Sequence, residues 1–200
     1  NSWVNSLVSS GIQINRLGSK IALYKFSAIL VLKGIVRTIL QLFENKLPVI
    51  SDKPYIVFIQ LSQNNLPLSG KQKSYDIISW YKSSKIKKPD IKEIWAQVRE
   101  EKIHQISSDI IVCRNIFPRF KKWSNYLQYL FKSFRALIIT CFGMIRGKWW
   151  YGLLFDESVL LHYASVLNDQ DLACEYLFHS VSWLHKPLWT YETELKGSDV

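Results

Sequence analysis

Apolar residues recur at intervals of three and four positions in five segments of this chain, which predicts helices. The longest predicted helix follows an N-cap at Ser19 and ends near Asn45, before Pro48. Four further helices are predicted over residues 74–82, 90–102, 118–146 and 156–167, with Gly147 closing the third of them.

Continuous apolar runs alternate with these helices. Residues 55–61, Tyr-Ile-Val-Phe-Ile-Gln-Leu, are typical of a strand buried on both faces, as in parallel sheets. Two further strands are predicted in the apolar run at 109–113 and in the segment at 171–180, which ends in a polar tip. After a loop at 181–186, a last helix is predicted from Pro187 to Gly197, with a further element beginning at residue 198.

The pattern indicates an α/β, helix-rich, Rossmann-like layered domain. We expect a helical lead-in over residues 1–50 and an α/β domain over residues 51–200 that is incomplete at its C-terminal end. The start at Asn1 and the stop after a strand–loop–helix unit suggest a fragment of a longer protein.

Composition supports a folded chain, because 48% of the residues are hydrophobic and only 14 of 200 are Gly or Pro. Charge is divided unevenly. Residues 1–150 carry 24 basic and 8 acidic side chains, a net +16, whereas residues 151–200 carry 2 basic and 8 acidic ones, a net −6. A basic front portion indicates a surface for lipid head groups or nucleic acid, or else a solvated lysine-rich face.

Two apolar stretches approach membrane length, at residues 21–43 and 134–155, but each contains three Lys or Arg residues. Such charges are costly inside a bilayer, so these stretches are predicted to be core helices or helices lying on a membrane surface.

The three cysteines lie far apart and form no metal-binding spacing, so we predict no metal site and favour a reducing compartment.

The predicted helix at 118–146 combines aromatic and basic residues. Three interpretations stay open: an amphipathic core helix, an interfacial membrane helix, or a less favoured nucleic-acid surface. The candidate membrane-binding residues are Arg119, Lys121, Lys122, Trp123, Lys132 and Arg135.

Ligands of open α/β sheets bind beyond the carboxyl ends of strands, and polar residues follow two of the predicted strands. Asn64 and Asn65 follow the first strand, and His179 and Ser180 form the polar tip at the end of the last strand segment. Turn chemistry explains the asparagines equally well. Neither a glycine-rich phosphate loop nor a Gly-x-Ser-x-Gly nucleophile motif occurs in the chain.

The last predicted helix adds three candidates. Lys186 and the helix N-terminus supply positive potential for an anion, and Glu192 is a candidate general base. Trp189 is expected to pack in the core or to stack on a sugar. The alternative for the acidic residues is a helix whose acids interact with its dipole.

Tyr176-Leu-Phe-His-Ser-Val-Ser-Trp183 and the following stretch Lys186-Pro-Leu-Trp-Thr-Tyr-Glu-Thr-Glu-Leu-Lys-Gly-Ser198 resemble the bacterial polysaccharide biosynthesis proteins named for a PFTS motif. The resemblance covers about 25 residues, and Pro-Phe-Thr-Ser itself does not occur in this chain. The resemblance places that motif downstream.

The resemblance implies a glycosyltransferase-like protein of surface polysaccharide assembly, in which this chain is the N-terminal, acceptor-side half of a two-domain GT-B architecture. It implies a nucleotide-sugar donor for the full-length protein and no cofactor in this part. The partner is a sugar or lipid-linked acceptor, whose hydroxyl attacks the anomeric carbon with His179 or Glu192 as base. The protein is then expected in the cytoplasm, peripheral on the inner membrane. The competing hypothesis is a non-enzymatic module that binds a membrane surface or nucleic acid.

Overall fold

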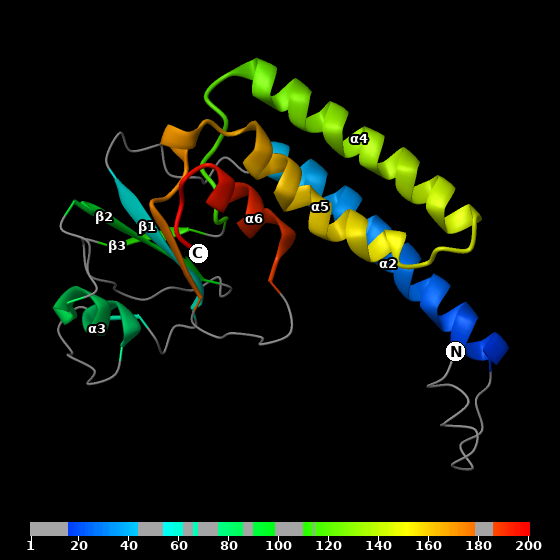
Figure 1. Ribbon diagram of the computed structural model, residues 1–200, viewed down its shortest axis with the longest axis horizontal. Coiled ribbons are helices and arrows are strands. Elements are labelled where there is room, and N and C mark those ends of the chain that lie inside the picture. Colours follow the sequence, from blue (N-terminus) through cyan, green and yellow to red (C-terminus); the bar gives the residue numbers. More distant parts are fainter. Residues whose placement is uncertain are drawn as a thin grey trace, which may run out of the picture.

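The computed structural model describes residues 16–43, 54–61, 66–67, 76–85, 90–98, 110–113, 115–178 and 186–200 (Figure 1). In these ranges the chain forms five helices, four strands and one short 3-10 turn. They are α2 (Arg16–Phe43), β1 (Tyr55–Leu61), α3 (Ile77–Ser83), β2 (Glu93–Val98), β3 (Ile110–Cys113), α4 (Trp123–Ile145), α5 (Tyr151–Val166), η2 (Asp169–Asp171), β4 (Glu175–Phe178) and α6 (Leu188–Leu195).

The four strands form one parallel sheet in the order β3-β2-β1-β4. Strands β1 to β3 extend in one direction across the sheet and β4 lies on the other side of β1, so the strand order reverses between β1 and β4. Beyond β4, Asp199 makes a parallel bridge with Glu175. The predicted α/β fold with Rossmann-like layering is confirmed.

Strand β1 is buried on both faces, as its unbroken apolar sequence predicts. Tyr55, Val57 and Ile59 pack into the core beneath α4, α5 and α6. Ile56 and Phe58 face the opposite way, toward α3. Helices therefore cover both faces of the sheet, with the long ones on one side and α3 on the other (Figure 1).

The helix predicted over residues 90–102 is wrong, because residues 93–98 form strand β2. β2 lies between β1 and β3, where both faces of the sheet are covered, so Ile94, Trp95 and Ala96 are all buried. Trp95 stacks on Tyr55 with 4.2 Å between ring centroids. The position between two neighbouring strands therefore outweighs Asp90, which is a possible helix cap in the sequence.

The remaining predicted elements are confirmed with shifted ends. α4 begins at Trp123 rather than at Pro118, because the backbone of Lys122 is extended. The Pro118 carbonyl accepts a 2.9 Å hydrogen bond from the Tyr163 hydroxyl. α5 begins five residues earlier than predicted, at Tyr151. Gly147 follows α4 with a positive φ of 86°, the left-handed conformation that glycine permits at a helix end.

Helices α2, α4 and α5 lie side by side and run away from the sheet, and we call them the helical arm (Figure 1). Small and polar residues of α2 face α5 across this arm. A Cβ atom on Gly152 of α5 would lie 2.1 Å from Ser27 Oγ, and one on Gly34 would lie 2.8 Å from the Phe155 ring. The backbones approach so closely because these positions carry little or no side chain.

Polar contacts also join α2 to α5. The buried Asp156 carboxylate pairs with Lys33 Nζ at 3.0 Å and with an Arg37 guanidinium nitrogen at 3.5 Å. Ser27 Oγ donates a 2.5 Å hydrogen bond to the Trp149 carbonyl. The charge inside the arm is therefore paired, which the low local dielectric requires.

Candidate functional site

The outer side of α4 carries large apolar side chains at intervals of three and four. Trp123 is 74% exposed and Ile145 at the other end is 82% exposed. Between them the exposed apolar residues are Leu127, Phe131, Phe134, Ile138 and Phe142. The buried side of the same helix carries Ser133, Thr140 and Gly143 as well as two tyrosines.

Helix α2 repeats this inverted pattern. Its buried side consists of Ser27, Leu30, Gly34, Thr38 and Gln41, at heptad-like spacing. Its exposed side carries Ile21, Phe26, Ile29, Leu32, Val36, Ile39 and Leu40. A helix packed in water usually buries its apolar face, whereas small residues between helices and apolar residues outside are typical of helices that contact lipid.

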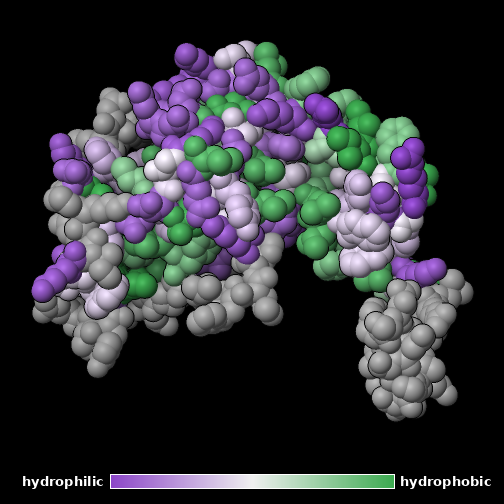
Figure 2. Space-filling model, viewed as in Figure 1, coloured by the Kyte–Doolittle hydropathy of each residue, from purple (hydrophilic) through white to green (hydrophobic). Residues whose placement is uncertain are grey.

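The hairpin between α4 and α5 has the composition of a membrane interface. Its sequence Arg146-Gly-Lys-Trp-Trp-Tyr151 places two cations beside three amphipathic rings. Lys148 Nζ lies 5.7 Å from the centroid of the Tyr151 ring. Trp and Tyr prefer the level of lipid head groups, and Lys and Arg beside them meet phosphates. Figure 2 shows hydrophobic side chains along the arm interspersed with hydrophilic ones.

The residues predicted to bind a membrane differ in how free their charges are. Arg119 Nε donates a 2.8 Å hydrogen bond to the Tyr126 hydroxyl, and Lys121 Nζ lies 2.8 Å from the Asp171 carboxylate. Lys122 and Arg135 are exposed and make no ion pair with any residue that the structure describes. The Tyr126 hydroxyl is neutral, so within the described ranges only Lys121 of these four side chains has its charge offset by a carboxylate, that of Asp171.

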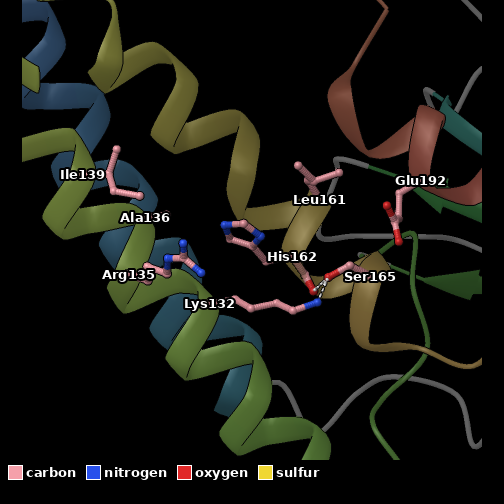
Figure 3. A pocket seen from close by; sticks show the side chains of 8 residues that line it. All are labelled: Lys132, Arg135, Ala136, Ile139, Leu161, His162, Ser165 and Glu192. Carbon is pink, nitrogen blue, oxygen red and sulfur yellow. Dashed lines mark hydrogen bonds between the residues drawn. The ribbon is translucent and has the colours of Figure 1, made fainter.

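A hollow of about 410 Å³ lies between α4, α5 and α6 (Figure 3). Lys132, Arg135 and Ile139 enter from α4, His162 and Ser165 from α5, and Glu192 from α6. Lys132 Nζ donates a 2.7 Å hydrogen bond to Ser165 Oγ. We call this hollow the cationic pocket. The fold thus brings together Lys132 and Arg135, which were predicted to bind a membrane, and Glu192, which was predicted to be a base.

His162 is a further polar side chain of the cationic pocket, and the sequence alone did not single it out. Its Nε2 is buried and has no hydrogen-bond partner among the described residues. Burial and the nearby Lys132 ammonium lower the pKa of His162 below its ordinary value, which favours the neutral ring. Only the packing of α4 against α5 reveals this environment, because His162 has no distinctive sequence neighbours.

Other candidates lie at or beside α6. Trp189 is buried among Phe117, Tyr176 and Phe178, so its ring packs in the core. Lys186 Nζ contacts the Glu194 carboxylate at 2.6 Å and lies 4.8 Å from the Tyr191 ring centroid.

Asn64, Asn65, His179 and Ser180 lie outside the described residues, but the strands that precede them are described. They follow β1 and β4, which are adjacent and parallel. The crevice at a reversal of strand order is where open α/β sheets bind ligands. Gln60, at the end of β1, has a positive φ of 60° beside a register shift, a strained conformation that functional edges often contain. The role of these four residues stays a prediction.

Comparison with protein-family models, with curated proteins and with solved structures finds no match for this chain. Within the described ranges, no helix combines the length and apolarity needed to cross a bilayer, and no group of His, Cys, Asp and Glu is arranged to hold a metal ion.

The cysteines are all free, and they should differ sharply in reactivity. Burial raises the pKa of Cys113 to about 12, so its reactive thiolate is scarce near neutral pH, whereas Cys141 is exposed on α4. We expect a thiol reagent to label Cys141 rapidly and Cys113 only on unfolding, as peptide mapping of the labelled chain can show. Rapid labelling of Cys113 in the folded chain would contradict this burial.

Proposed function

We propose that this chain attaches to anionic membrane surfaces through its helical arm. The inverted pattern of α2 and α4 carries this proposal, because both helices turn small and polar residues inward and large apolar residues outward. Exposed apolar area of this extent is unusual for a protein surface in contact with water alone.

Charge complementarity favours a lipid surface over another protein as the partner. Exposed cations accompany the apolar stripes at Lys20, Lys25, Lys122, Arg146 and Lys148. Interfacial helices combine this cationic rim with an apolar face that enters the boundary between head groups and acyl chains. Nucleic acid would favour cations together with stacking rings, but not the aliphatic side chains that dominate α2.

We further propose that the attached domain is the acceptor-side part of a glycosyltransferase-like protein of bacterial surface polysaccharide assembly, cytoplasmic and peripheral on the inner membrane. The sequence resemblance to the PFTS-motif proteins supports this assignment, and a parallel α/β sheet is compatible with half of a GT-B enzyme. The full-length protein would take a nucleotide-sugar donor and transfer the sugar to an acceptor hydroxyl. Glu192 and His179 remain the candidate bases.

Vesicle sedimentation tests the attachment. We expect the chain to bind vesicles containing phosphatidylglycerol, to bind phosphatidylcholine vesicles weakly, and to be released by salt. Each head-group contact by Lys or Arg contributes about 1 kcal/mol, so Lys25→Gln, Lys122→Gln and Lys148→Gln should each weaken binding about fivefold. Lys85→Gln, an exposed cation just after α3, is the matched control and should leave binding unchanged.

Three results would contradict the attachment. Equal binding to neutral and anionic vesicles would remove the role of the cations. A stable dimer that ignores vesicles would show that a second copy covers the arm. Retention on single-stranded DNA with a steep salt dependence, and no sedimentation with vesicles, would favour the nucleic-acid alternative.

A further inference from the structure

The cationic pocket continues along α4 toward the hairpin between α4 and α5. Lys132, Arg135, Ile139, Phe142 and Arg146 are spaced by three or four residues and so share one side of the helix. Ile139 lines both the cationic pocket and a second hollow of about 240 Å³, which Phe142, Gly143, Arg146, Lys148 and Tyr151 complete. The two hollows therefore meet at an aliphatic side chain.

The polar groups of the cationic pocket suit an anion. Arg135 presents a planar guanidinium with no ion-pair partner in the described part of the chain, and Lys132 beside it is held by a neutral hydroxyl, Ser165 Oγ. Arginine binds phosphate oxygens through two parallel N–H groups. In Figure 3 the His162 ring projects toward α4, into the pocket that Arg135 also lines.

We propose that the groove between α4 and α5 binds a phosphate-bearing lipid, with its phosphate at Lys132 and Arg135 and its hydrocarbon along Ile139 and Phe142. This proposal rests on the attachment of the arm to a membrane surface, and it adds a specific site for one lipid. Within the proposed transferase, the same arrangement would hold a lipid-linked acceptor by its phosphate. The carboxylate of Glu192, which also lines the pocket, would then lie near the polar end of that acceptor.

The experiment uses two soluble probes, so that no vesicle is present. Dihexanoyl phosphatidic acid, below its critical micelle concentration, and inorganic phosphate are titrated into the chain by calorimetry. In parallel, NMR follows the ring nitrogens of His162. We expect the lipid to bind saturably and about tenfold more tightly than inorganic phosphate, because only the lipid contacts Ile139 and Phe142.

Variants separate the pocket from the rest of the surface. Arg135→Gln, at an exposed position, should weaken binding of the lipid about tenfold, since it removes charge-assisted hydrogen bonds. Glu192→Gln should strengthen it, because a negative charge at the pocket is removed. Lys85→Gln, just after α3 and away from the arm, should change it less than twofold. Bound phosphate should also raise the pKa of His162, because it offsets the Lys132 charge that lowers it.

Equal affinity for inorganic phosphate would overturn the lipid assignment, and no saturable binding of either probe would overturn the whole proposal. A loss in Lys85→Gln as large as in Arg135→Gln would show that the lipid binds diffusely to surface cations. Vesicle binding without binding of the soluble lipid would contradict the lipid site in the pocket and support the attachment of the arm. Binding of the soluble lipid without vesicle binding would contradict the attachment and support the lipid site.

Discussion

Replacing Phe131 and Phe134 by serine should weaken binding of the chain to phosphatidylglycerol vesicles by about 30-fold or more. The two rings are 69% and 61% exposed on the outer side of α4. Full burial of a Phe side chain contributes roughly 1.5–3 kcal/mol, so even partial insertion of two rings corresponds to about 2 kcal/mol, or a factor of about 30. Vesicle titration of the wild type and the double variant measures the difference.

The control for this substitution is Trp80→Ser. Trp80 is 58% exposed on α3, which covers the opposite face of the sheet from the arm. Its replacement removes one exposed aromatic ring that lies outside the arm, and it should leave vesicle affinity unchanged. Because the three side chains are exposed, all variants should unfold at nearly the wild-type urea concentration. Equal losses of vesicle binding in the control and in the double variant would show that the arm has no special role.

Gly152→Ala should destabilise the folded chain by about 1–3 kcal/mol, although the same change in an ordinary helix interior stabilises by about 1 kcal/mol. The added Cβ would lie 2.1 Å from Ser27 Oγ and 2.6 Å from the Ser27 carbonyl oxygen. The carbonyl belongs to the backbone of α2, so the helices must separate. Urea unfolding of the variant measures the change in the free energy of unfolding.

Ala28→Val provides the comparison, because Ala28 is exposed on the same helix and the larger side chain meets open solvent. That variant should differ from the wild type by less than about 0.5 kcal/mol. A Gly152→Ala chain more stable than the wild type would show that α2 and α5 do not pack as closely as described. The close packing of the arm would then be unsupported.

Local pattern was sufficient for most elements of this fold. The unbroken run Tyr55–Leu61 predicted a strand buried on both faces, and the glycines at 147 and 197 predicted helix ends that have positive φ in the structure. β2 was mistaken for a helix because its burial comes from the neighbouring strands, which the sequence does not display.

The candidate site was harder to predict for a related reason. Lys132, His162 and Glu192 belong to three helices, and no spacing along the chain indicates that they line one pocket. The inverted pattern of α2 was present in the sequence, but both of its sides satisfy helical periodicity. Only packing decides that Ser27, Gly34 and Thr38 face inward.

The most direct test of the arm as a membrane surface uses Cys141, which is exposed on α4 among Ile138, Phe142 and Ile145. A nitroxide attached there reports its depth through its accessibility to oxygen and to an aqueous nickel chelate. With phosphatidylglycerol vesicles, we predict that oxygen accessibility rises and chelate accessibility falls. A nitroxide that stays accessible to the chelate while the chain is bound to vesicles would contradict the account.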